Sequence, residues 1–124
     1  MERENLPVEM VGFQRYPMKY LHNSSVYLST SRFEGLPYAL VEASSIGLPL
    51  VVTDVVGNNE VAINNENGFT FGSAEEGASA LRKILNDDVL FRNMSKRSRE
   101  MFEEKFTIEV MIHKLLIVYH NFGN

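Results

Sequence analysis

Two glutamates after a strand-like segment form the part of the sequence best suited to binding chemistry. Glu34 and Glu42 lie eight positions apart, with Gly35, Leu36 and Pro37 between them. Carboxylates accept hydrogen bonds from hydroxyl groups. A glycine turn that leads into a helix also leaves backbone N–H groups for phosphate or sugar oxygens. The stretch is typical of a site for a ligand that carries hydroxyl and phosphate groups.

A helix is expected to begin at Pro37, because proline lacks an N–H group that would have no partner in the first turn. An apolar face follows at helical spacing; it consists of Ala39, Leu40, Ala43 and Ile46. Another stripe carries Tyr38, Glu42 and Ser45. Gly47 followed by Pro49 predicts the end of the helix. Glu34 is thus expected on the loop before the helix, and Glu42 one turn inside it.

Strand and helix patterns alternate before this site and after it. Strands are predicted over residues 8–13, 26–30, 50–53 and 69–71, and short helices over 17–22 and 58–63. This alternation predicts an α/β fold with a parallel sheet and helices on both faces. The nearly continuous apolar character of 26–30 favours a buried strand. Ligands of such sheets bind at the carboxyl ends of strands, and the loop 31–36 follows one of these ends.

The remainder of the sequence predicts three helices. Ser73 caps the first, whose apolar side has Leu81, Ile84 and Leu85. Asp87 or Asp88 caps the second, whose expected buried positions are Leu90, Phe91, Met94, Met101 and Phe102. Thr107 caps the third, whose apolar positions are Ile108, Met111, Ile112, Leu115, Leu116 and Tyr119. No repeat or linker divides the sequence, so residues 1–124 are expected to form a single domain.

Four motifs in this order resemble those of a known family. They are Ser31-Arg-Phe-Glu-Gly-Leu-Pro-Tyr-Ala-Leu-Val-Glu42, Gly47-Leu-Pro-Leu-Val-Val-Thr-Asp54, Val56-Gly-Asn-Asn-Glu-Val61 and Glu66-Asn-Gly-Phe-Thr-Phe71. Over about residues 8–120 the chain resembles retaining glycosyltransferases of the two-Rossmann-domain (GT-B) type, family 4. The resemblance implies a partial Rossmann-like parallel sheet with helices on both faces, equivalent to the later part of the C-terminal, donor-binding domain.

The resemblance also implies a reaction and roles for residues. The family transfers a hexosyl group from a nucleotide sugar, here expected to be a UDP-sugar, to a saccharide or lipid-linked acceptor in surface polysaccharide biosynthesis. Glu34 would be the catalytic residue near the anomeric centre, and Glu42 would hold the ribose hydroxyls. Arg15 would lie near the nucleotide base. The backbone and shape of four further residues would bind the donor; these are Gly35, Leu36, Pro37 and Tyr38. Leu36-Pro37 replaces the commoner Phe-Gly of the family.

Several family features have no counterpart in this sequence. The acceptor domain is missing, as is the Arg and Lys pair that neutralises the donor diphosphate. We therefore expect an N-terminally truncated, inactive chain whose partners are the nucleotide sugar and either a missing N-terminal domain or a second copy. Two absent family strands would separate 8–13 from 26–30. Residues 8–13 are therefore expected to move beside 26–30 or to pair across a dimer, because an unpaired strand edge favours association.

Composition excludes several other classes of protein. The net charge of −4 argues against nucleic acid as a partner, and the absence of cysteine excludes a disulfide framework. No apolar segment is long enough for a membrane span and the N-terminus lacks a signal peptide pattern, so a cytoplasmic location is expected. Neither a metal nor a cofactor is expected, since the histidines are scattered and Asp87-Asp88 reads as a helix cap. A basic cluster could touch anionic lipid, although a solvated helix face is the simpler reading; it consists of Arg92, Lys96, Arg97 and Arg99.

A non-enzymatic interpretation stays open beside the glycosyltransferase interpretation. The chain would then be a non-catalytic remnant or a partner-binding domain, with weak nucleotide-sugar binding or none. Glu34 would merely place a favourable charge at a helix N-terminus, and Glu42 would be an ordinary solvated side chain.

Overall fold

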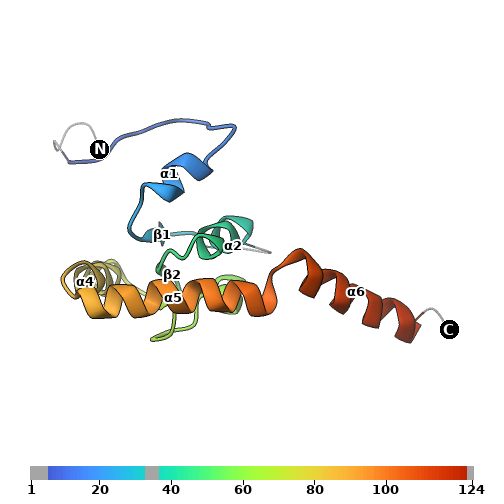
Figure 1. Ribbon diagram of the computed structural model, residues 1–124. Coiled ribbons are helices and arrows are strands. Elements are labelled where there is room, and N and C mark those ends of the chain that lie inside the picture. Colours follow the sequence, from blue (N-terminus) through green and yellow to red (C-terminus); the bar gives the residue numbers. More distant parts are fainter. Residues whose placement is uncertain (1–5, 33–36, 123–124) are drawn as a thin grey trace.

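The computed structural model describes residues 6–32 and 37–122, and Figure 1 shows their arrangement. Within these residues, three strands form one parallel sheet in the order β1-β2-β3. The strands are β1 (Tyr27–Ser29), β2 (Leu50–Thr53) and β3 (Gly68–Phe71). Leu28 pairs with Val51 and Val51 pairs with Phe69, so the three strands are in register. The predicted α/β fold with a parallel sheet is confirmed.

Six helices are described along the chain, in the order predicted. They are α1 (Met18–His22), α2 (Tyr38–Ser45), α3 (Asn58–Val61), α4 (Ala74–Leu85), α5 (Asp88–Lys105) and α6 (Ile108–Phe122). The predicted caps are confirmed where the side chains accept hydrogen bonds from the first turn. Ser73 Oγ accepts from the N–H of Glu76, Asp87 from those of Val89 and Leu90, and Thr107 Oγ1 from that of Val110.

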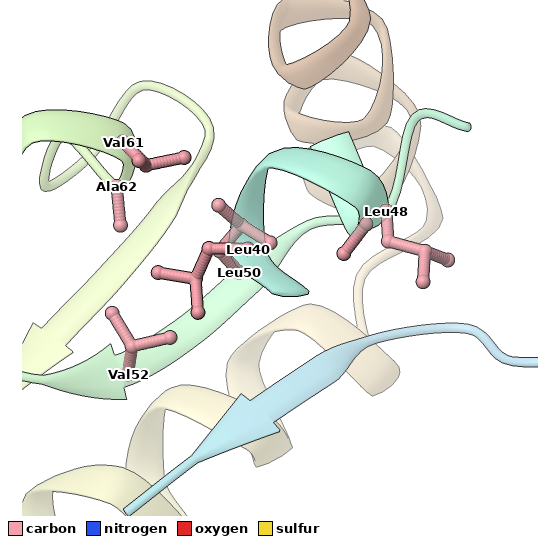
Figure 2. Packing of buried hydrophobic residues seen from close by; sticks show 7 residues of the cluster. Leu40, Leu48, Leu50, Val52, Val61 and Ala62 are labelled. Atoms are coloured by element: carbon pink, nitrogen blue, oxygen red, sulfur yellow. The ribbon is translucent and has the colours of Figure 1, made fainter. Parts of the chain in front are cut away.

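The central strand β2 separates two hydrophobic clusters, because successive side chains of a strand point to opposite faces. Leu50 and Val52 join Leu40 of α2 and Val61 of α3 in one cluster (Figure 2). Val51 points the other way and joins a cluster that includes Phe71, Ala80, Ile84 and Met94 from β3, α4 and α5. Helices therefore cover both faces of the sheet, as the sequence predicts.

The N-terminal segment departs from the prediction. Residues 8–13 contain no strand and lie outside the sheet, so the predicted strand is wrong. Gly12 has a φ of 66°, which interrupts an extended run, and most apolar side chains of the segment are exposed. β1 is consequently an edge strand among the described residues, and the side chain of Leu28 is 49% exposed. The predicted burial of 26–30 is wrong: Val26 and Tyr27 pack against the two clusters but are only half-buried, and no residue of the segment is fully buried.

The apolar positions of the last helix are not covered by the rest of the described chain. Figure 1 shows α6 projecting away from the sheet and the other helices. Its predicted apolar positions are all exposed, from Met111 at 47% to Ile108 and Tyr119 at 74%. Leu85, expected on the apolar side of α4, is likewise exposed. Helical spacing correctly predicted the helices, but burial also requires a surface for the apolar stripe to contact.

Candidate functional site

A pocket of about 250 Å³ lies where the carboxyl ends of the three strands meet. Its lining residues are Ser31, Arg32, Thr53, Asp54, Val55, Phe71 and Gly72. Thr53 and Phe71 are the last residues of β2 and β3, and Ser31 follows β1 by two positions. This is the edge of a parallel sheet where ligands bind. It is also the edge from which the chain leaves β1 towards α2.

Hydrogen bonds tie the pocket walls to one another. The Thr53 hydroxyl donates to the carbonyl oxygen of Ser31, which connects β2 to the segment after β1. Asn58 Nδ2 donates to the Thr53 carbonyl oxygen over 3.0 Å. The N–H of Asp54 donates to the Phe71 carbonyl oxygen over 2.8 Å, which connects β2 to β3. The pocket is therefore built on backbone that is held in place from three strands.

The first turn of α2 has no side-chain cap among the described residues. Pro37 was expected as the first residue of the helix, but it is the N-cap, and the helix begins at Tyr38. The Pro37 side chain provides no hydrogen bond to the helix. The Pro37 carbonyl oxygen accepts from the N–H groups of Leu40 and Val41. Proline cannot supply the oxygen that serine or aspartate would place at a cap. The N–H groups at the very start of α2 therefore suit an oxygen-rich ligand.

The structure describes four of the seven predicted site residues and does not bring them together in the pocket. Pro37 is buried, whereas Tyr38 and Glu42 are exposed on α2, and Arg15 is exposed in the segment before α1. Three of the predicted residues, Glu34, Gly35 and Leu36, lie outside the described residues. The assigned roles of the whole set stay predictions, because Pro37, Tyr38, Glu42 and Arg15 do not line the pocket described above and the other three residues lie outside the described residues.

Arg32 places a positive side chain in the pocket lining. The sequence interpretation included Arg32 in the first of its four motifs and gave it no role. It did not single out Thr53, Asp54, Phe71 or Gly72, although each ends or directly follows a predicted strand. The rule that ligands bind at strand carboxyl ends, applied to all strands instead of one, would have found them.

A larger pocket of about 430 Å³ lies between β3 and the first turns of α4. Its lining includes Asn64, Thr70, Glu75, Glu76 and Lys83. Two of these groups are already engaged: Glu76 accepts from the N–H of Gly72, and Asn64 accepts from that of Thr70. Each pocket has one basic side chain in its lining, and the smaller pocket is the better candidate because it lies at the ends of all three strands.

The basic cluster on α5 is largely neutralised by neighbouring carboxylates. Lys96 pairs with Glu100, Arg99 pairs with Glu103 over 2.9 Å, and Arg97 pairs with Glu66, Glu100 and Glu104. These exposed pairs support the solvated helix face over a lipid contact. In the part of the chain that the structure describes, no acidic, histidine or cysteine side chains gather in a way that could hold a metal ion. No helix among those residues combines the length and apolarity of a membrane span.

Comparison with known proteins supplies the family. The family model described as "Glycosyl transferases group 1" matches residues 3–101. The chain is 31% identical over 112 residues to the UDP-Gal:alpha-D-GlcNAc-diphosphoundecaprenol alpha-1,3-galactosyltransferase of Escherichia coli, which covers 89% of this chain and 29% of that protein. It is 25% identical over 121 residues to the capsular polysaccharide biosynthesis glycosyltransferase CapM of Staphylococcus aureus, covering 96% of this chain and 32% of that protein.

A solved structure agrees with these relatives. The crystal structure of TarM superposes with a TM-score of 0.74 at 27% identity, covering 87% of this chain and 22% of that one. The chain thus spans about a third or less of the length of these relatives. With a family model matching well over half of the chain, and a fold that agrees, this protein belongs to the glycosyl transferases group 1 family.

Proposed function

We propose that this chain is the donor-binding part of a retaining glycosyltransferase that moves a hexosyl group from a UDP-sugar to a saccharide or lipid-linked acceptor in surface polysaccharide biosynthesis. The observation that carries the proposal is the pocket at the carboxyl ends of all three strands, in a chain of this family. Two relatives support the donor and the pathway: the Escherichia coli protein is a UDP-Gal galactosyltransferase, and the Staphylococcus aureus protein is a glycosyltransferase of capsular polysaccharide biosynthesis.

The chemistry of the pocket suits the pyrophosphate of such a donor. Departure of a nucleoside diphosphate leaves negative charge, which positively charged and N–H groups stabilise. Arg32 supplies a positive charge in the pocket. The first turn of α2 follows Arg32 in the chain, lies outside the pocket lining and has no side-chain cap among the described residues, and it would supply N–H groups to the ligand. The proposed binding uses no metal ion. Glu42, exposed one turn inside α2, would accept hydrogen bonds from the ribose hydroxyls.

Titration of the chain with UDP, followed by NMR, tests the proposal. We expect resonance changes at the pocket residues and at α2. Glu42→Gln should weaken binding by more than tenfold, because a hydrogen bond to a charged acceptor contributes roughly 1.5–3 kcal/mol. Glu109→Gln is the matched control, since Glu109 is an exposed glutamate on α6 and its loss changes the net charge equally. Equal affinity of the two variants would remove Glu42 from the site.

The non-enzymatic interpretation makes the opposite prediction. The exposed apolar side chains of α6 favour a domain that packs against a partner. Under that interpretation UDP would cause no saturable resonance changes in the wild-type chain. We also propose that the chain alone transfers no sugar, since the family's acceptor domain and its basic pair have no counterpart in the sequence. Release of hexose from a panel of UDP-sugars well above a buffer control would contradict this.

A further inference from the structure

A buried asparagine contacts a residue of the pocket lining without lining the pocket itself. Asn58 is the first residue of α3 and is fully buried. Its Nδ2 atom lies 3.0 Å from the Thr53 carbonyl oxygen and 3.2 Å from Thr53 Oγ1. Thr53 Oγ1 in turn donates to the carbonyl oxygen of Ser31. Asn58, Thr53 and Ser31 thus form a hydrogen-bond relay from α3, through the end of β2, to the segment that follows β1.

The orientation of the Asn58 amide follows from its neighbours. A carbonyl oxygen only accepts, so the atom that faces the Thr53 carbonyl must be the NH₂ group. The other amide atom, Oδ1, is buried and has no hydrogen-bond partner among the described residues. An unpaired buried acceptor lowers stability, and an apolar side chain of similar size would avoid that cost. Filling space in the core therefore does not account for an asparagine at this position. Donating a hydrogen bond to Thr53 does account for it.

A second buried asparagine shows what a purely structural role looks like. Asn67 is also fully buried, and both ends of its amide are satisfied. Its Nδ2 donates to the Val61 carbonyl oxygen and its Oδ1 accepts from the N–H of Ile63, each over 2.8 Å. Asn67 precedes β3 at the opposite end of the sheet from the pocket, and neither of its partners lines the pocket.

We propose that Asn58 is a positioning residue for donor binding: its amide holds Thr53, whose hydroxyl holds the backbone of Ser31, so that Ser31 and Arg32 keep the wall of the pocket in its binding geometry. The inference rests on the proposed function, because the ligand is the same UDP-sugar. Its particular content is that a side chain outside the pocket sets the affinity through two hydrogen bonds in series.

The test compares Asn58→Ala with Asn67→Ala in the 124-residue chain, with UDP as the probe. Both variants lose a buried amide and should be less stable in urea. Asn58→Ala should also move the amide resonances of Ser31 and Arg32 and weaken UDP binding by roughly tenfold in the folded protein. Asn67→Ala should leave those two resonances and the UDP affinity of the folded fraction close to wild type.

The Thr53 variants provide a second route if Asn58→Ala fails to fold. Thr53→Val keeps the branched shape and removes the hydroxyl, so it should reproduce the loss of affinity. Thr53→Ser restores the hydroxyl and should recover most of it. Combining Thr53→Val with Asn58→Ala should cost little more than either change alone, because members of one relay are not additive.

Three results would overturn the inference. Wild-type UDP affinity in Asn58→Ala or Thr53→Val overturns the relay and leaves the proposed function standing. An equal loss of affinity in Asn67→Ala shows a general effect of destabilisation and overturns it also. Absence of UDP binding in the wild-type chain overturns this inference and the proposed function together.

Discussion

The middle of the chain and its two ends use apolar residues in opposite ways. In the middle, residues 37–106, the apolar side chains of β2, α2, α4 and α5 meet in two clusters on the two faces of the sheet. At the ends, residues 6–16 and α6, most of the large apolar side chains are exposed. Both regions have apolar residues at the spacing of helices or strands in the sequence. The difference teaches that periodicity predicts an element, while burial depends on a complementary surface.

The largest expected effect comes from adding a side chain at Gly68, where β3 lies close to β2 in the middle region. A Cβ on Gly68 would overlap the backbone carbonyl of Leu50, to which β3 is paired. Neither backbone can move without breaking the sheet, so Gly68→Ala should destabilise the fold by more than about 3 kcal/mol. Urea unfolding measures this. Gly72→Ala is the control, because a Cβ there meets only Glu76 Oε2 at 3.8 Å. Similar unfolding midpoints for the two variants would show that the strands are not this close.

The two long helices provide the second contrast. Met94 of α5 is 1% exposed and lies in the cluster with Val51 and Phe71. Met94→Ala should cost about 2–5 kcal/mol, because it removes buried methylene groups and leaves a cavity. Leu115 of α6 is 62% exposed, so Leu115→Ala should change the free energy of unfolding by less than about 0.5 kcal/mol. Equal losses in the free energy of unfolding for the two variants would show that Leu115 is packed as well as Met94, and would contradict this contrast.

A smaller effect is expected at the start of α5. Asp87 Oδ1 accepts hydrogen bonds from the N–H groups of Val89 and Leu90, over 3.1 and 3.0 Å. Asp87→Ala should lower the free energy of unfolding by about 1 kcal/mol. Asp87→Asn should retain most of the cap. The neighbouring Asp88→Ala is the control, since the sequence left both aspartates open as the cap and the structure assigns the role to Asp87. A larger loss in Asp88→Ala would reverse that assignment.

Serine substitutions on the exposed apolar side of α6 should have the smallest effect on stability. The same substitutions should have a large effect on association between molecules. A triple change at Ile112, Leu115 and Tyr119 to serine should leave the unfolding of the middle region nearly unchanged, since all three side chains are exposed. It should reduce concentration-dependent association measured by light scattering, because contiguous exposed apolar surface promotes contacts between molecules. A wild-type chain that stays monomeric at high concentration would contradict the second part. A loss of cooperative unfolding in the variant would contradict the first.

The candidate site stays a prediction over much of its length, whereas the prediction for the N-terminal end is wrong. Glycine and proline signals, strand character and the expected helix start at Pro37 pointed to the loop 31–36, of which the structure describes Ser31 and Arg32, both in the pocket lining. Those signals were not enough to find Asn58, because it reaches the site through a hydrogen-bond relay between segments that are distant in sequence. Residues 8–13 were predicted as a strand, and that prediction is wrong: the segment does not pair with the open edge of β1 or with any other described strand.

Local chemistry in the sequence by itself determined most of the elements of this protein. The caps Ser73, Asp87 and Thr107, the positive φ of Gly47 at the end of α2 and the apolar run of β2 all depend on residues within a few positions of one another. Tertiary structure decided which apolar faces are buried, that β1 is an edge strand, and which strand ends meet in the pocket. These outcomes depend on contacts between distant segments, and the sequence pattern of one segment does not contain the surface of another.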